Sequence, residues 1–103
     1  MTYASYRAIK ELLAQREAFT GNSMSAIRPE GKDRDGDHIS HMGMLYHDPA
    51  AAAEFSGRTF EYLVFSYGTP IAGVTDDGEV VVNRSKYSVT TSRHQGMLYN
   101  LYR

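Results

Sequence analysis

The chain has 103 residues, of which 42% are hydrophobic and 12% aromatic, and its formal net charge is -1. This length fits one domain. The near-neutral charge excludes a nucleic-acid wrapper that relies on bulk positive charge. The lack of cysteine excludes disulfide scaffolds, thiol catalysis and cysteine-ligated zinc. No apolar run approaches the roughly 20 residues of a membrane span, and the N-terminus is too polar for a signal peptide, so we expect a cytoplasmic protein.

Residues 3–19 predict an amphipathic helix, because they contain no Gly or Pro and their apolar side chains recur at helical spacing. We expect Gly21 to end this helix in the left-handed conformation. Arg16 lies near the middle of the apolar stripe, where its stem can pack while its guanidinium reaches the rim. An ion-paired or anion-binding Arg16 is the alternative.

Residues 23–28 alternate weakly between apolar and polar and predict a short strand. An edge of the sheet is one position for this strand. The charged, glycine-containing residues 29–37 are typical of a solvated loop. We expect residues 39–46 to return to the core as a short extended piece.

A second, short helix is predicted to begin at Pro49. Asp48 can cap its free N–H groups, and Pro49 fits the first helical position, where no donor is needed. The alanine run and Phe55 continue the helix for about two turns, and Gly57 is expected to close it.

Four strands are predicted in the second half. Residues 60–67 are dense in aromatic and β-branched side chains at both parities, which indicates a central strand covered on both faces. A turn at residues 67–70 leads to a second strand at 71–75. The Asp-Asp-Gly sequence at 76–78 indicates a tight hairpin before a third strand at 79–83. Residues 87–90 alternate and predict a fourth strand.

The chain ends in a predicted helix whose N-cap is supplied by Thr90, Thr91 or Ser92. Its apolar stripe consists of Met97, Leu98 and Leu101.

The predicted fold class is α+β. Strands that are adjacent in sequence and joined by short turns form an antiparallel meander, here of three to four strands. N-terminal, short middle and C-terminal helices are expected to pack on one face of it. We expect residues 1–103 to form a single domain.

Several short motifs are similar to those of a known family. They are Phe-Thr-Gly-Asn-Ser at 19–23, a Gly-Met-Leu step at 43–45, Ser-Tyr-Gly-Thr-Pro-Ile-Ala at 66–72 and Tyr-Ser-Val-Thr-Thr-Ser-Arg-His-Gln at 87–95. Together they resemble a small domain of bacteriophage and prophage proteins, especially those of actinobacterial phages, for which no activity is established. Residues 29–41 have no counterpart in it, and at Gly73 we expect a bulkier residue. The resemblance implies a phage or prophage origin and the host bacterial cytoplasm as the setting, and it implies no catalytic residue.

Three hydroxyl residues, Arg93 and His94 gather at the predicted strand-to-helix junction, residues 90–94. Free N–H groups and the positive end of the helix dipole suit this junction to bind a phosphate or carboxylate, to which Arg93 can add bidentate contacts. The alternative, which we favour, is that one hydroxyl caps the helix, Arg93 is solvated and His94 packs against Leu98. If the first and fourth predicted strands lie close together, Tyr67 comes near the same junction.

The chain has eight tyrosines and no tryptophan. Tyrosine is enriched at protein interfaces, so an exposed aromatic surface is one interpretation, and a position at the boundary of the core is the other. The cations Arg84, Lys86, Arg93 and Arg103 make the last quarter locally basic. Such a patch suits single-stranded nucleic acid or an acidic protein surface.

Metal and enzyme motifs are incomplete. The histidines at 38, 41 and 47 do not form a paired-ligand motif, and the aspartates at 33, 35 and 37 fail to continue as a calcium loop. There is no nucleophile elbow and no Gly-rich phosphate loop. We therefore expect no catalytic residues, no metal and no cofactor.

These observations favour a non-enzymatic phage accessory protein that binds a host or phage macromolecule through the sheet and the C-terminal helix face. The favoured kind of macromolecule is a protein. The alternative is a nucleic-acid or nucleotide/phosphate binder that uses the helix start at 90–94, and a small hydrolase using His94 is a weaker third. The predicted binding residues are Tyr67, Thr69, Tyr87, Thr90, Thr91, Ser92, Arg93, His94 and Tyr99.

Overall fold

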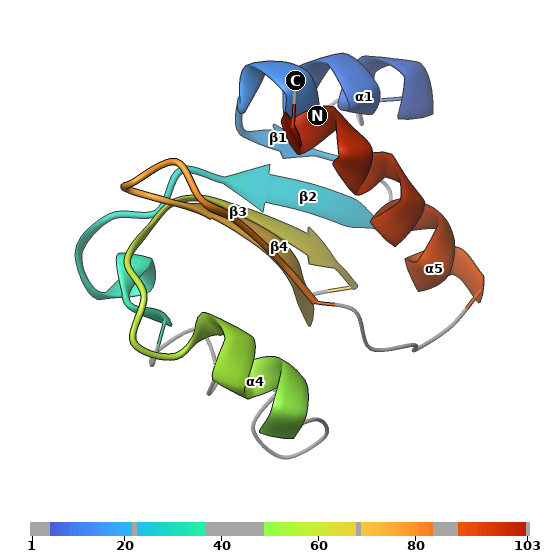
Figure 1. Cartoon of the computed structure of the whole chain (residues 1–103). Helices are drawn as coiled ribbons and strands as arrows, with labels where there is room; N and C mark the ends of the chain where they lie inside the picture. Colours follow the sequence, from blue (N-terminus) through green and yellow to red (C-terminus); the bar gives the residue numbers. More distant parts are fainter. Residues whose placement is uncertain (1–4, 22, 37–48, 68, 84–88, 103) are drawn as a thin grey trace.

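The computed structural model describes residues 5–21, 23–36, 49–67, 69–83 and 89–102. Figure 1 shows the arrangement of its elements. In chain order they are α1 (Tyr6–Gln15), β1 (Phe19–Thr20), β2 (Met24–Ile27), the 3-10 helix η1 (Gly31–Arg34), α4 (Pro49–Phe55), β3 (Phe60–Ser66), β4 (Thr69–Thr75), β5 (Val80–Val82), α5 (Val89–Gly96) and the 3-10 helix η2 (Met97–Tyr102). None of the helices in these ranges has the length and apolar content that crossing a membrane requires.

The strands form one antiparallel sheet in the order β1-β2-β3-β4-β5. The α+β class and the meander of β3, β4 and β5 are as predicted, and so is the strand near residues 23–28. That strand is not at an edge, because β1 pairs with its outer side. The sheet has five strands, whereas a meander of three to four was predicted. The meander itself supplies β3, β4 and β5, the strand near residues 23–28 adds β2, and residues 19–20 form a further strand that the helical pattern did not suggest.

The N-terminal helix is shorter than predicted at both described ends. Arg16 adopts the left-handed conformation with φ 55°, and its N–H bonds to the carbonyls of Leu12 and Leu13. Its guanidinium donates to the carbonyl of Leu101 at 3.2 Å, which fixes the half-buried side chain at the end of the last helix. The predicted cap at Gly21 is therefore wrong. Gly21 lies in the turn between β1 and β2, where an added Cβ would come within 2.6 Å of the Met24 carbonyl oxygen.

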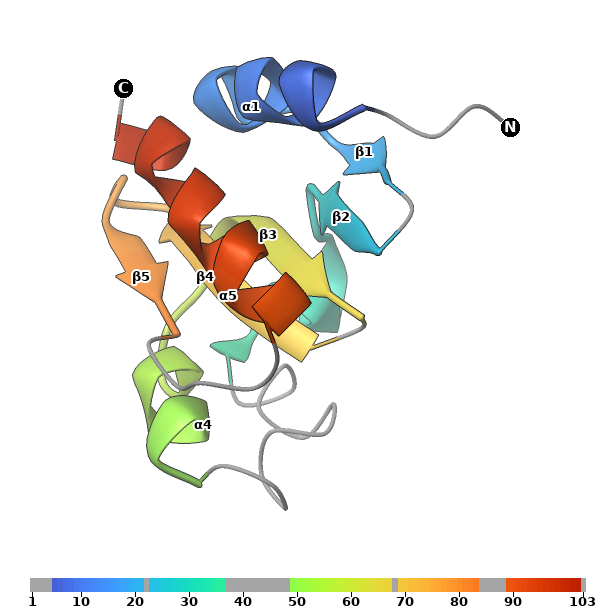
Figure 2. The same ribbon diagram turned by 90° about the vertical axis from the view of Figure 1, so that its right-hand side faces the viewer.

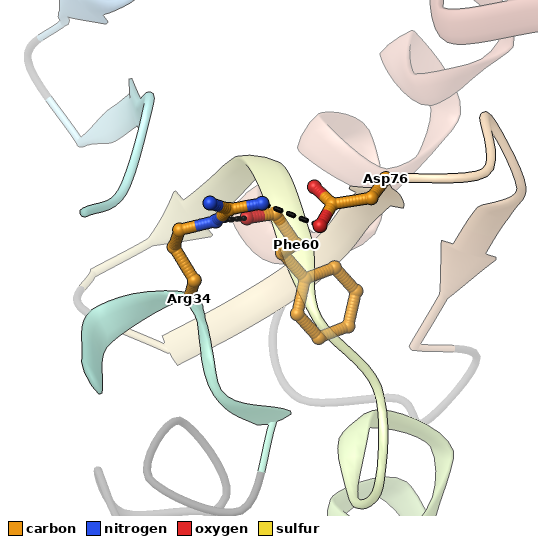
Figure 3. A network of polar contacts seen from close by, with 3 residues as sticks. All are labelled: Arg34, Phe60 and Asp76. Atoms are coloured by element: carbon orange, nitrogen blue, oxygen red, sulfur yellow. Dashed lines mark hydrogen bonds and ion pairs between the residues drawn. The ribbon is translucent and has the colours of Figure 1, made fainter. Parts of the chain in front are cut away.

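The fourth predicted strand is not present in its described part. Positions 87 and 88 lie outside the described residues, and positions 89 and 90 begin α5. The predicted extended piece at 39–46 also lies outside the described residues. The loop at 29–37 contains η1, and Arg34 at its end ties it to the sheet (Figure 3). Arg34 Nε donates to the Phe60 carbonyl at 3.3 Å, and the guanidinium forms an ion pair with Asp76.

Helices cover both faces of the sheet, which corrects the prediction that all pack on one face. Figures 1 and 2 show α1 and α5 on one side and α4 on the other. One hydrophobic cluster joins the sheet to α1 and η2, and a second joins it to α4 through Ala52 and Phe55. The reason lies in β3, which supplies Tyr62 and Val64 to the first cluster and Leu63 and Phe65 to the second. The predicted central strand, covered on both faces, is thus confirmed.

The predicted apolar stripe of the last helix is also confirmed, because Met97, Leu98 and Leu101 are all buried in the first cluster. Gly73, where we expected a bulkier residue, lies on the α4 side of β4. A Cβ added there would be 2.5 Å from two ring carbons of Phe60. Because Phe60 is fully buried, its ring has no free direction in which to move. The small residue is therefore required by the packing of this face.

We expect Gly73→Ala to lower the free energy of unfolding by about 1–3 kcal/mol, the usual cost of overpacking a core. Gly96→Ala is the matched control, because nothing lies within 4 Å of its added Cβ. At this helical position alanine should raise stability by up to about 1 kcal/mol. Urea unfolding followed by circular dichroism measures both values. Similar effects of the two substitutions would contradict the packing explanation.

Candidate interaction site around His94

The imidazole of His94 is fully buried and hydrogen-bonded on both sides. Its Nδ1 lies 2.7 Å from Ser66 Oγ. Its Nε2 lies 3.2 Å from Ser23 Oγ and 3.4 Å from the hydroxyl of Tyr6. Relative exposure is 0% for His94 and 1% for Ser66. We name Tyr6, Ser23, Ser66 and His94 the histidine cluster.

Local structure brings each member to this point. Tyr6 is the first residue of α1, which Ser5 caps through a hydrogen bond from the Ala8 N–H to Ser5 Oγ at 3.3 Å. Ser23 precedes β2, and Ser66 ends β3 directly opposite Met24. His94 faces them from α5. Three of the motifs in the family resemblance, at 19–23, 66–72 and 87–95, therefore meet at one imidazole.

Two tyrosine rings pack against His94 and remain open to solvent. The Tyr6 ring centroid lies 6.0 Å from that of His94 in an edge-on arrangement, and the Tyr67 centroid lies 6.2 Å from it. Tyr6 is 44% exposed and Tyr67 is 64% exposed. The N–H of Tyr67 donates to the Ser23 carbonyl at 2.8 Å, so the backbone of this residue is fixed while its ring faces outward. The buried cluster thus supports an exposed aromatic pair.

Burial lowers the pKa of His94, and the nearby charge of Arg93 lowers it further. The imidazole is therefore neutral at pH 7, with one ring N–H that donates and one ring nitrogen that accepts. Serine and tyrosine hydroxyls can each donate or accept, so they satisfy both ring nitrogens without a charged partner. A neutral, fully bonded imidazole is the state that a buried site favours.

The predicted binding residues differ in their location and in their exposure to solvent. Tyr67 lies beside His94. The sequence made this proximity conditional on a fourth strand, and it arises instead because His94 of α5 packs at the end of β3. Arg93 is exposed, as the favoured interpretation held, and Thr69 is half-buried at the start of β4. Tyr99 is 80% exposed in η2. Tyr87 lies outside the described residues.

The predicted N-cap at Thr90, Thr91 or Ser92 is wrong, because α5 begins at Val89 and all three lie within its first turn. His94 cannot meet a ligand directly, since it is buried and both ring nitrogens already have partners inside the protein. Of the junction at 90–94, Arg93 is the residue that the structure shows to be exposed. Because His94 is buried, it cannot contribute to the anion site predicted at this junction, and Arg93 is the remaining charged residue of that site.

Sequence reasoning missed Tyr6, Ser23 and Ser66. Ser23 and Ser66 stand in the motifs at 19–23 and 66–72, so their positions carried a signal. Nothing local linked either serine to a histidine, because the bonds join residues 71 and 28 positions apart. Tyr6 was placed only at the margin of an apolar stripe.

The Ser66–His94 distance is short enough for general-base catalysis, but a substrate has no access to two groups that are 1% and 0% exposed. We therefore interpret the cluster as a cross-link between α1, the β1–β2 turn, β3 and α5. Among the described residues, no group of three or more His, Asp or Glu side chains could hold a metal ion. The histidines at 38, 41 and 47 lie outside that part of the chain.

The fold and this site define a small α+β domain with a buried histidine cross-link beneath exposed tyrosines. The chain belongs to DUF8033, a family of unknown function whose model matches residues 7–102. This range contains Ser23, Ser66 and His94. No curated protein and no solved structure matches the chain.

We expect His94→Gln to lower the free energy of unfolding at pH 8 by about 1–3 kcal/mol, because it leaves a buried hydroxyl without its partner. The unfolded chain takes up a proton at His94 near the usual pKa of 6.5, whereas the folded pKa is lower. The stability that neutral His94 provides is therefore complete above pH 6.5 and is lost as the pH falls toward the folded pKa.

Urea unfolding of the two proteins between pH 8 and 5 (about the range in which histidine titrates) tests this prediction. The difference between wild type and His94→Gln should shrink as the pH falls through 6.5. The subtraction removes the contribution of the other histidines. A difference that is constant over this range would show that burial does not disfavour the charged form of His94.

Proposed function

We propose that this protein is a non-enzymatic accessory protein of bacteriophage or prophage origin, and that it binds a host or phage protein through Tyr6, Tyr67 and Arg93. We name these three residues the tyrosine face. The observation that supports the proposal most directly is the exposure of the Tyr67 ring, which is 64% exposed beside the buried His94. The φ of Tyr67 is 51°, in the left-handed region.

A non-glycine residue in this region costs about 1–2 kcal/mol. Packing of the Tyr67 side chain offsets little of that cost, since most of the ring is in water. A two-residue turn between antiparallel strands requires a positive φ at its first position, and Ser66 pairs with Thr69 across such a turn. The turn accounts for the backbone of Tyr67, and it leaves the ring in solvent, where a partner can reach it.

The chemistry of the face suits a protein partner. Tyrosine and arginine are enriched among the residues that dominate binding energy at protein interfaces. Both rings already pack against His94, and the Tyr67 backbone is bonded to Ser23, so little side-chain freedom remains to be lost on binding. The two rings form a small, preorganised contact surface, and the exposed Arg93 is next to His94 in the chain.

The origin and the setting rest on the family resemblance of the motifs, which implies a phage or prophage protein in the host cytoplasm. The binding of single-stranded nucleic acid would use the same rings for stacking. The net charge of -1 favours a protein partner over a polyanion. The experiments below separate the two partners.

Tyr67→Asn should abolish most of the binding without loss of the fold. Asparagine tolerates the left-handed region better than tyrosine, so we expect the free energy of unfolding to stay within about 1 kcal/mol of wild type or to rise. We expect the affinity for the partner protein, which the crosslinking experiment below identifies, to fall by about tenfold or more, as at a binding hot spot. Denaturant unfolding and titration calorimetry measure the two quantities. A variant that loses stability but retains its affinity would contradict the assignment.

The partner can be identified by a photo-crosslinking amino acid placed at position 67, with position 99 as the comparison. Tyr99 is even more exposed and lies in η2, so it controls for non-specific crosslinking of a surface tyrosine. In lysate from an actinobacterial host, we expect one protein adduct at position 67 that is insensitive to nuclease. An adduct that disappears with nuclease, or one that forms only at position 99, would overturn the proposal.

A further inference from the structure

We infer that α5 opens as a local unit: it leaves and rejoins the sheet by bending at Gly96, while η2 stays packed. The part of this inference that concerns binding rests on the proposed function, because Tyr6 and Tyr67 are supported by the His94 ring only when α5 is docked. Three observations support the opening: the composition of α5, the contacts that attach it, and its junction with η2.

The sequence of α5 disfavours a helix. Val89, Thr90 and Thr91 are β-branched, and such residues lose side-chain freedom in a helix. Gly96, its last residue, belongs to the poorest helix former after proline. A helix of eight residues is also too short to be stable alone in water. The helical state of α5 therefore depends on contacts with the rest of the fold.

The described contacts that attach α5 are polar. Of the α5 side chains that the structure describes, at positions 93–96, only His94 is buried. His94 is bonded to the three hydroxyls of the histidine cluster, and Gln95 Nε2 donates to the Asn83 carbonyl at 2.6 Å. Each such bond contributes little net stability, because water replaces it in the open state. Segments held in this way are the ones that open locally.

The next element, η2, is attached by apolar packing. Its Met97, Leu98 and Leu101 side chains are buried in the hydrophobic cluster that joins the sheet to α1. Burial of an aliphatic side chain contributes more than one neutral hydrogen bond does. We therefore expect η2 to stay in place under conditions in which α5 opens.

The junction between the two elements is suited to bending. The α-helix ends at Gly96 and a 3-10 helix begins at Met97, so the hydrogen-bonding pattern changes there. Gly96 is exposed, and nothing lies within 4 Å of a Cβ added to it. Glycine has the widest range of backbone conformations. The backbone at this point can therefore bend without displacing a neighbour.

Opening of α5 takes the tyrosine face apart. The rings of Tyr6 and Tyr67 pack against His94, which leaves with α5. Arg93, the third member of the face, belongs to α5 itself. A partner that needs the assembled face binds only the docked state, so binding and docking stabilise each other. We therefore expect a bound partner to suppress the opening of α5.

Amide hydrogen exchange of the intact chain, measured by NMR, tests the opening. The His94 amide reports on α5, the Leu101 amide on η2 and the Val64 amide on the central strand β3. We expect the protection of the His94 amide to be at least tenfold lower than that of the other two. Equal protection of His94 and Val64 would show that α5 opens only when the whole domain unfolds. Equally low protection of His94 and Leu101 would refute a hinge at Gly96. Either result overturns the inference.

Substitutions outside the tyrosine face change the opening in opposite directions. Gln95→Ala removes the bond to the Asn83 carbonyl and should lower the protection of the His94 amide about threefold. Gly96→Ala stiffens the junction and should raise that protection about threefold. Ser56→Ala is the control, because it removes a hydroxyl bond at the end of α4, on the other face, and should change the protection less than about twofold. Equal effects of Gln95→Ala and Ser56→Ala would refute the role of the α5 contacts.

The link to binding is tested on the protein adduct formed at position 67. Hydrogen exchange followed by mass spectrometry compares this adduct with the free chain. Peptides from α5 should be at least tenfold better protected in the adduct, whereas peptides from α4 should change less than about twofold. Equal protection of α5 in the two samples would overturn the link. If no protein adduct forms, the proposed function fails and the link fails with it, while exchange in the free chain still decides whether α5 opens.

Discussion

The imidazole of His94 holds together segments that the chain order separates. Its two nitrogens are bonded to hydroxyls that lie 71 and 28 residues earlier, in the β1–β2 turn and at the end of β3. A buried imidazole needs a partner for each nitrogen, and these hydroxyls need the imidazole. The position of α5 above the sheet is therefore tied to the positions of the turn and the strand end. Tyr6 adds the start of α1 to the same centre.

The exposed chemistry of the molecule depends on this buried centre. Tyr6 and Tyr67 both rest on the His94 ring, and the Tyr67 backbone is bonded to the residue that contacts Nε2. Polar groups in the interior are costly unless all of them are satisfied, and when satisfied they fix a single arrangement. Here that arrangement sets the direction of two rings that otherwise have little to hold them. The interior of the site is thus neutral, whereas its surface is charged and aromatic.

Sequence reasoning succeeded where the determinants are local or periodic. The density of apolar residues at both parities identified β3 as central, and Asp-Asp-Gly located the β4–β5 hairpin, where Gly78 has φ 87°. It failed where a distant contact decides. β1 exists because Phe19 can pair with Ala26, and this pairing ends α1 at Arg16 instead of Gly21.

For the candidate site, the sequence identified single residues but not the contacts between them. Arg93 and His94 stood out by residue type, and Tyr67 by its place in a turn. The hydrogen bonds of His94 with Ser23 and Ser66 are tertiary contacts. Residue types alone do not show which hydroxyl will lie next to which imidazole in the fold. The choice between a ligand-binding and a packed histidine therefore required the fold, which shows His94 buried.

The two hydrophobic clusters share the sheet, but none of the described helices belongs to both. Among the described residues, α4 is held on its face by a smaller set of apolar side chains than the one that joins α1 and η2 to the other face. Proteins open locally in cooperative units, and the least supported unit opens first. Fraying of the α4 layer would then leave the opposite layer intact. The proposed binding surface, which lies on the opposite layer, would keep its structure during such opening.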